Sequence, residues 1–161
     1  DLLVCLLDRP RHGELIAKVR AAGARVRLIL DGDVSGVIAA GMPSSAVDVY
    51  LGIGGAQQGV LAAAALRCFD AHMQCRLVIR SGEDAELAKA AEIPDPARKY
   101  TAEEIARGNV TFAATGVSEG PMLNGVDLYP GGAVTHSMVM RSRTGTFRFI
   151  EGHHDFTRGN G

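Results

Sequence analysis

The sequence lacks a basic excess, and this limits the partners that the protein can have. Among 161 residues, 17 Lys and Arg stand against 18 Asp and Glu, which gives a formal net charge of -1. Nucleic-acid affinity comes largely from counterions that basic residues release, so this balance argues against a general polyanion binder. A small phosphorylated ligand remains compatible, because it needs only a few local cations.

Membrane-spanning and secretory segments are lacking as well. No apolar run reaches the ~20 residues that a spanning helix needs, and no signal peptide is visible. The three cysteines, Cys5, Cys68 and Cys75, have no CxxC spacing. Cys5 and Cys68 lie in apolar runs, which is typical of buried thiols in a reducing compartment. We therefore expect no membrane partner and no disulfide framework.

Several catalytic and nucleotide-binding motifs are also missing. The stretch LGIGGAQQGV, residues 51–60, has Gln57 where a dinucleotide fingerprint needs glycine, and Val60-Leu61 replaces the Lys-Ser/Thr of a Walker A loop. No HExxH motif or nucleophile elbow occurs. His136 and Ser137 have no acid partner at a recognisable triad spacing. The GHH stretch at 152–154 is more typical of an exposed tail than of a metal site.

The chain does contain a repeating alternation of apolar strands and helices. The expected strands are 2–7, 25–30, 47–53 and 73–79, and the expected helices are 12–24, 33–41 and 59–69. Such alternation predicts an α/β fold with a largely parallel sheet flanked by helices. Residues 81–108 read as a polar, helical excursion broken by Pro94 and Pro96. Alternating residues after 109 predict a β-rich C-terminal third with a hairpin turn at Thr144-Gly145.

Polar clusters follow each of the first three expected strands. They are DRPRH (Asp8–His12), DGD (Asp31–Asp33) and GIGG (Gly52–Gly55). The carboxyl ends of neighbouring strands in an open α/β sheet line one crevice, where ligands bind. The sequence therefore predicts one site built from these three loops. Thr115 and Gly116, at the end of a later expected strand, are placed to join it.

Each cluster suggests a chemistry and an alternative. Pro10 stiffens the loop that presents Arg9 and Arg11, whose guanidinium groups match phosphate oxygens; the alternative is a solvated loop with a salt bridge to Asp8. We expect His12 to cap a helix or lie at the surface rather than act as a catalytic base.

The other two clusters leave similar choices open. Asp31 and Asp33 could accept hydrogen bonds from sugar hydroxyls or bind a hard metal ion, and Asp33 could instead cap the next helix. The glycines at 52–55 allow close approach of a ligand at a helix N-terminus that favours an anion; the alternative is a tight strand–helix turn.

Longer motifs resemble a known family across nearly the whole chain. They are DRPRH, GARVRLIxDGD, GIGGAxxGVLAAAALRC, FAATGVSEGPMLNGV and GGAVTHSMVMRSRTGTFRFIEGHH. Together they resemble the C-terminal half of class II fructose-1,6-bisphosphatase, the bacterial type related to lithium-sensitive inositol phosphatases. The resemblance implies alternating layers of helices and sheets, a cytoplasmic location and a homo-oligomer. It also implies Mn²⁺- or Mg²⁺-dependent hydrolysis of fructose 1,6-bisphosphate, with sedoheptulose 1,7-bisphosphate as a further substrate.

The resemblance assigns substrate contacts, but the sequence departs from the family at its metal ligand. The implied substrate-binding residues are Arg9, Pro10, Arg11, Asp31, Gly32, Asp33 and Gly55. Gln58 replaces the family's metal-binding glutamate, and Gln57 replaces a proline. An amide oxygen can coordinate a cation but brings no negative charge.

The resemblance also implies that most metal carboxylates belong to an N-terminal half that these residues do not include. We therefore expect residues 1–161 to form a single substrate-binding half of a larger fold, with the catalytic residues elsewhere. The alternative is a non-catalytic phosphosugar-binding or regulatory domain. A dinucleotide-binding oxidoreductase is disfavoured because the fingerprint fails.

Overall fold

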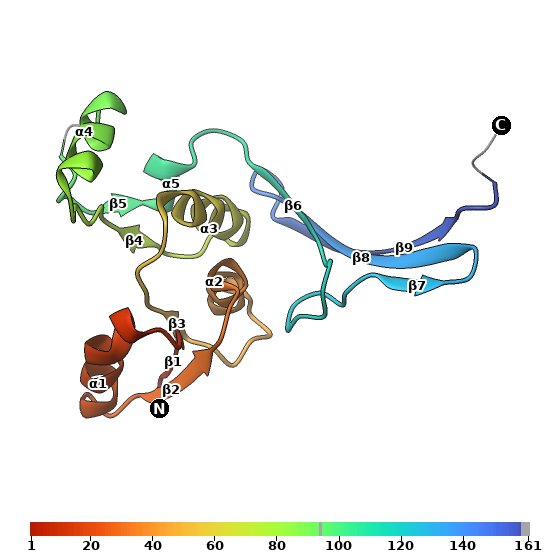
Figure 1. Cartoon of the computed structure of the whole chain (residues 1–161), viewed down its shortest axis with the longest axis horizontal. Coiled ribbons are helices and arrows are strands. Elements are labelled where there is room, and N and C mark those ends of the chain that lie inside the picture. Colours follow the sequence, from red (N-terminus) through yellow and green to blue (C-terminus); the bar gives the residue numbers. More distant parts are fainter. Residues whose placement is uncertain (94, 159–161) are drawn as a thin grey trace.

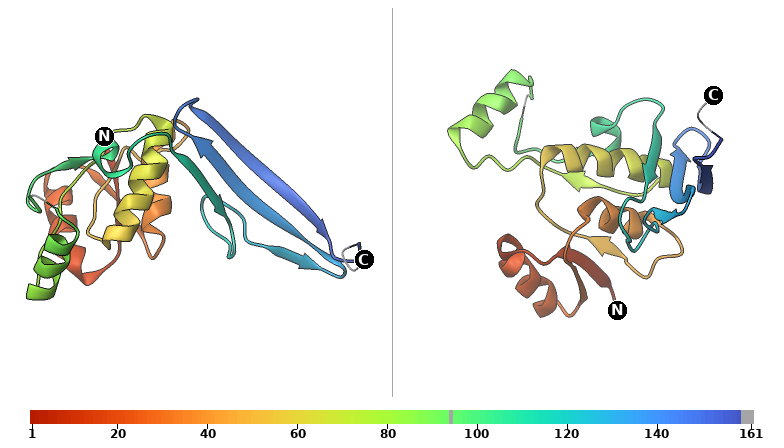
Figure 2. Two further views of the ribbon diagram at one scale, coloured as in Figure 1. Left: turned by 90° about the horizontal axis from the view of Figure 1, so that it is seen from above. Right: turned by 45° about the vertical axis from the view of Figure 1, so that its right-hand side comes forward.

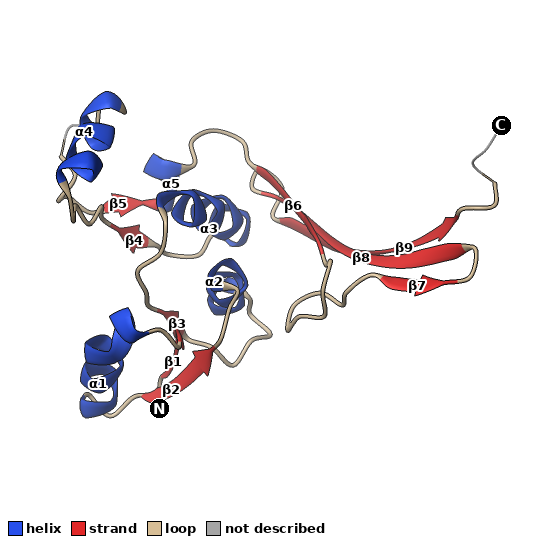
Figure 3. Cartoon of the chain, in the orientation of Figure 1, coloured by secondary structure: helices blue, strands red, loops and turns tan. Residues whose placement is uncertain are grey.

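The structure, a computed structural model, describes residues 1–93 and 95–158 and contains three sheets (Figures 1 and 3). The helices are η1 (Pro10–His12), α1 (Gly13–Ala21), α2 (Asp33–Gly41), α3 (Ala56–Phe69), α4 (Gly82–Ala90) and α5 (Ala102–Ile105). The strands are β1 (Leu3–Leu7), β2 (Arg25–Ile29), β3 (Val49–Tyr50), β4 (Gln74–Cys75), β5 (Tyr100–Thr101), β6 (Thr111–Thr115), β7 (Asp127–Tyr129), β8 (Gly132–Arg141) and β9 (Thr146–Asp155). Within the described ranges, each helix is too short or too polar to cross a membrane.

The first sheet is parallel, with the strand order β2-β1-β3. Its central strand β1 is the continuous apolar run of the sequence, and both of its faces are covered. Val4 and Leu6 pack with Ile16 and Val19 of α1 on one face, while α2 contacts β1 and β3 on the other. The predicted α/β organisation is thus confirmed for this part of the chain.

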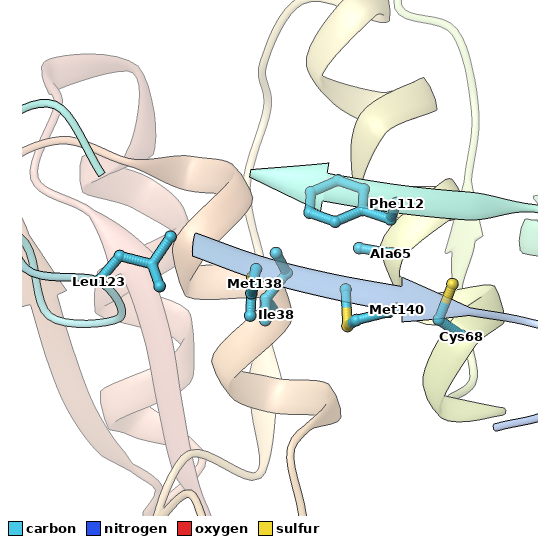
Figure 4. Close-up of a cluster of buried hydrophobic side chains, with 7 residues drawn as sticks. All are labelled: Ile38, Ala65, Cys68, Phe112, Leu123, Met138 and Met140. Carbon is cyan, nitrogen blue, oxygen red and sulfur yellow. The ribbon is translucent and has the colours of Figure 1, made fainter. Parts of the chain in front are cut away.

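Helices α2 and α3 lie between this sheet and a second sheet, the antiparallel one formed by β6, β7, β8 and β9. The shared core consists of buried side chains from α2, α3, β6, β8 and the loop before β7 (Figure 4): Ile38, Ala65, Cys68, Phe112, Leu123, Met138 and Met140. Gly41 of α2 lets the two helices approach closely, since a Cβ there would lie 2.7 Å from a methyl carbon of Leu66 of α3. The order along the molecule is therefore α1, parallel sheet, α2 and α3, antiparallel sheet.

The antiparallel sheet forms the β-rich C-terminal third that the sequence predicts. β8 pairs with β6 and β7 on one side and with the whole of β9 on the other. The hairpin turn lies at the predicted place, where Gly145 has a φ of 58° that favours glycine. The β7–β8–β9 part extends away from the helices (Figure 2).

The expected strand at 73–79 does not join the parallel sheet, so that prediction is wrong. Only β4 forms there, and it pairs antiparallel with β5. α3 packs against α2 and the second sheet, which delivers the chain to the far side of the helix layer from β1 (Figure 1). Val78 and Ile79 remain 47% and 42% exposed. An apolar run fixes a preference for extended structure but does not choose its partner.

The polar excursion at 81–108 contains helices α4 and α5, as predicted, together with β5. Ser81 and Thr101 begin the two helices, and each accepts a hydrogen bond from the main-chain N–H three residues later, forming a capping box. Pro94 lies outside the described residues.

Candidate functional site

The loops that follow β1, β2 and β3 meet, as the three polar clusters predict. Asp8 N–H donates to Ile29 C=O at 2.8 Å, which joins the first loop to the end of β2. Arg11 Nε donates to Ile53 C=O at 2.8 Å, and Ile53 N–H donates to His12 Nε2 at 2.9 Å. The side chains of one loop thus hold the main chain of another.

Residues 8–12, which we call the arginine loop, include the short helix η1, which Pro10 begins. Arg11 is exposed, and its Nε is bound to Ile53. Its terminal nitrogens make no hydrogen bond within residues 1–93 and 95–158, so they can reach a ligand. Arg9 is half-buried, with Nη1 3.4 Å from Asp8 C=O. Neither arginine forms the alternative salt bridge to the Asp8 carboxylate in the described part of the chain.

The two aspartates of the DGD cluster have different surroundings. Asp31 is exposed, and its Oδ1 accepts from Gly32 N–H at 2.8 Å. Asp33 is half-buried, and its Oδ2 lies 3.0 Å from the position of a Cβ on Gly54. The alternative of Asp33 as N-cap is wrong: Gly32, with φ 81°, is the N-cap, and Asp33 is the first residue of α2. Asp33 therefore faces residues 52–55, which we call the glycine loop.

The glycine loop leads directly into the N-terminus of α3. Gly55 is the N-cap and supplies no side-chain cap, and the first turn has no acidic residue. The N–H groups of that turn lack partners within the helix and carry a partial positive charge, which favours an anion. Gln58 is exposed, and its Oε1 lies where a Cβ on Gly55 would be. Any larger residue at 55 would displace Gln58.

His12 is fully buried, so its expected role at the surface is wrong. It occupies the N-cap position of α1 but makes no side-chain capping bond. Its Nδ1 lies 2.9 Å from Leu7 C=O, and its Nε2 accepts from Ile53 N–H. The short helix η1 directs the ring toward the glycine loop. There one nitrogen pairs with the main chain of Leu7 and the other with the main chain of Ile53.

Sequence reasoning missed Tyr50, whose side chain lies between α2 and the glycine loop. A Cβ on Gly36 would lie 2.8 Å from its ring, and a Cβ on Gly52 would lie 3.3 Å from its hydroxyl. Burial raises the pKa of Tyr50 to about 12, and the negative charge of Asp33 adds to the rise. The available signal was position: Tyr50 ends the third strand, two residues before the first glycine.

We expect Tyr50 to ionise late in an alkaline titration. The pKa of folded Tyr50 is raised from its ordinary 10.0 to about 12. This group therefore contributes stability that is complete below pH 10.0 and is lost as the pH rises towards 12. Phenolate absorbance should show a late step that disappears in Tyr50→Phe and persists in Tyr129→Phe. A late step that survives in Tyr50→Phe would contradict this assignment.

Several candidates lie elsewhere, in the antiparallel sheet. Thr115, expected to join the site, instead lies with Oγ1 2.8 Å from Ser137 Oγ. His136 does have an acidic neighbour, since its Nδ1 lies 4.0 Å from Glu151 on the paired strand. Ser137 and His136 are adjacent on one strand and point to opposite faces, so no triad forms. The expected exposed tail at 152–154 is part of β9, where His153 contacts Glu151 at 2.7 Å.

The described residues do not compose a divalent-metal site by themselves. They contain no group of three or more His, Cys, Asp or Glu side chains that could hold a metal ion. Asp33 and Gln58 place two oxygens beside the neighbouring glycines 54 and 55. Hard divalent ions take about six or more oxygen ligands and prefer carboxylates. Two oxygens, one of them neutral, are a poor match for such an ion.

The sequence is similar to those of known proteins. The family model described as bacterial fructose-1,6-bisphosphatase, glpX-encoded, matches residues 1–154. The D-fructose 1,6-bisphosphatase class 2/sedoheptulose 1,7-bisphosphatase of Synechococcus elongatus is 43% identical over 169 aligned residues, covering 97% of this chain and 49% of the relative. The enzyme of the same name from Crocosphaera subtropica is 43% identical over 164, covering 94% and 48%. The chain spans about half the length of these relatives, and it belongs to the class II fructose-1,6-bisphosphatase family.

Proposed function

We propose that this chain is the substrate-binding half of a metal-dependent phosphatase. The complete site hydrolyses fructose 1,6-bisphosphate to fructose 6-phosphate and phosphate, with sedoheptulose 1,7-bisphosphate as a second substrate. The carrying observation is Arg11, which is tied by its Nε to the loop that begins α3 and keeps its terminal nitrogens available. A cytoplasmic location and self-association into a homo-oligomer belong to the same proposal.

In this proposal the phosphate of the sugar lies between the arginine loop and the N-terminus of α3. The terminal nitrogens of Arg11, with Arg9 beside them, donate charge-assisted hydrogen bonds to phosphate oxygens. The unpaired N–H groups of the first turn of α3 contribute the helix dipole. Pro10 limits the rearrangement of its loop that binding requires.

The sugar hydroxyls face the carboxylates in the same proposal. Asp33 is aimed at Gly54 and can accept hydrogen bonds from a sugar bound over the glycine loop. Asp31 is more exposed and reaches the outer part of the ligand. The hydroxyl of Tyr50, close to Gly52, remains protonated at neutral pH and can donate to the same ligand.

The chemical step is not assigned to this chain. Phosphoryl transfer to water needs several carboxylates that position metal ions and the attacking water. Asp33 and Gln58 do not suffice for this, so Mn²⁺ or Mg²⁺ would need further ligands from outside residues 1–161. Gln58 also favours a second candidate: a non-catalytic phosphosugar-binding or regulatory domain.

Calorimetric titration and a phosphate-release assay test these proposals together. We expect fructose 1,6-bisphosphate to bind the 161-residue chain and unphosphorylated fructose not to bind. With Mn²⁺ present, phosphate release by this chain alone should not exceed background. Turnover would contradict our assignment of binding without chemistry, and absence of bisphosphate binding would contradict the proposed function. The non-catalytic candidate would be disfavoured if this chain binds the bisphosphate without hydrolysing it while a longer protein that contains this chain does hydrolyse it.

Gln58→Glu should tighten binding of Mn²⁺ to this chain. The new carboxylate would lie beside Gly55, next in sequence to the Gly54 that Asp33 faces, and at a helix N-terminus that favours an anion by about 0.3–1 kcal/mol. Two carboxylates attract a dication more strongly than one carboxylate and an amide. Titration of Mn²⁺ followed by electron paramagnetic resonance measures the change. Gln57→Glu is the matched control, because it adds the same charge one residue earlier; equal tightening in both variants would mean that position 58 has no special geometry.

A further inference from the structure

Both main-chain groups of Ile53 are held by side chains from the loop after β1. Arg11 Nε donates to its C=O at 2.8 Å, and His12 Nε2 accepts from its N–H at 2.9 Å. Ile53 lies between Gly52 and Gly54, in a loop that has no secondary structure of its own. This pair of contacts, which we call the Ile53 clamp, joins the arginine loop to the glycine loop.

The hydrogen bonds of His12 fix one form of its ring. A main-chain N–H can only donate, so Nε2 must carry a lone pair toward Ile53. The neutral ring then carries its proton on Nδ1, which faces Leu7 C=O at 2.9 Å. His12 is fully buried, so water does not compete for either nitrogen. The ring is thus a neutral bridge from the end of β1 to the glycine loop.

We infer that His12 is a positioning residue that fixes the glycine loop against the arginine loop. Glycine gives residues 52–55 much conformational freedom, and binding would have to remove that freedom if nothing had removed it beforehand. The clamp removes it in the free protein. It therefore sets the distance between the terminal nitrogens of Arg11 and the N-terminus of α3. The effect on ligand affinity rests on the proposed function, whereas the clamp itself does not.

Two amide substitutions separate the two hydrogen bonds of His12. In His12→Asn, the side-chain NH₂ can take the place of Nδ1 and donate to Leu7 C=O, but nothing reaches Ile53. In His12→Gln, the longer side chain can place its oxygen where Nε2 was and accept from Ile53 N–H. Both variants lose one bond of a buried side chain, so both should be destabilised to a similar extent. Only His12→Asn should release the glycine loop.

Amide hydrogen exchange at Ile53 reads the clamp without any ligand. We expect exchange at least about tenfold faster in His12→Asn than in His12→Gln, the scale of one lost hydrogen bond. Fructose 1,6-bisphosphate should bind at least about tenfold more weakly to His12→Asn than to His12→Gln. Ile16→Val is the control, because it removes a buried methyl from the cluster between α1 and β1 and leaves the clamp intact. It should lower stability without changing either readout.

The outcomes separate the clamp from the proposed function. Equal exchange of Ile53 in the two His12 variants would overturn the clamp. Different exchange with equal affinity for fructose 1,6-bisphosphate would overturn the positioning role. If the unaltered chain does not bind the bisphosphate, the proposed function fails, and with it the positioning role for that ligand, while the exchange data still decide the clamp. If the variants do not fold, nitrogen NMR of the native His12 ring decides it: a proton on Nε2 instead of Nδ1 would overturn the clamp.

Discussion

Replacing Arg11 by Ala should weaken fructose 1,6-bisphosphate binding by about 1.5–3 kcal/mol, which is about 10–150-fold in the dissociation constant. The substitution removes charge-assisted hydrogen bonds to phosphate and one contact of the Ile53 clamp. Arg11 is exposed and fills no core, so stability should change little. Calorimetric titration measures the affinity, and chemical denaturation measures the stability.

Arg20→Ala is the matched control for charge. Arg20 is exposed on α1, so its replacement removes the same unit of charge without touching the three loops. Equal losses of affinity in Arg11→Ala and Arg20→Ala would mean that only net charge attracts the ligand. Arg11→Lys should fall between the native chain and Arg11→Ala, because lysine keeps the charge but loses the planar fork. Native affinity in Arg11→Ala would remove this residue from the site.

The place of the candidate site could be predicted from the sequence because parallel strands share one direction. Once β1, β2 and β3 are assigned as parallel neighbours, the residues after each strand must lie at the same edge. The main-chain contact of Asp8 with Ile29 follows from that rule, and so does the closeness of the loops that contain Arg11 and Ile53. No knowledge of side-chain packing was needed, since chain direction alone brings these residues together.

The roles of His12 and Tyr50 could not be predicted, because each depends on which way a side chain turns. His12 follows two arginines and precedes a glycine, a polar setting that is typical of the surface. Its burial comes from η1 and from the main-chain groups of Leu7 and Ile53 that happen to lie below it. The orientation of Tyr50 is set by α2, since only glycine at position 36 leaves room for its ring. Such contacts form between segments distant in sequence.

The pairing between strands distant in sequence could not be predicted either. The run at 73–79 has five apolar residues among seven, yet β4 pairs with β5 from the polar excursion. Glu151 meets His136 only because the β8–β9 register places them opposite each other. Sequence pattern reports the preference of a segment for a strand, whereas register depends on the turn and on both faces of the finished sheet.

Met138→Ala should destabilise the chain by about 2–5 kcal/mol, the usual cost of removing a large buried side chain and leaving a cavity. Met138 is fully buried on β8, where it packs in the same cluster as Ile38 of α2 and Ala65 of α3 (Figure 4). Its loss weakens the contact between the antiparallel sheet and the helix layer. Denaturation by urea, followed by circular dichroism, measures the change.

Val139→Ala is the control for Met138→Ala, and affinity supplies the second comparison. Val139 is the next residue of β8, half-buried on the opposite face, so its truncation should cost less than Met138→Ala. Equal costs would mean that the face carrying Met138 is not the packed one. The folded Met138→Ala chain should keep native affinity for fructose 1,6-bisphosphate, because Met138 lies in the second sheet and contacts none of the three loops. Arg11→Ala should lose affinity and keep stability, and Met138→Ala should do the reverse. A loss of affinity in folded Met138→Ala would show that the loops depend on the antiparallel sheet as well as on the ends of β1, β2 and β3.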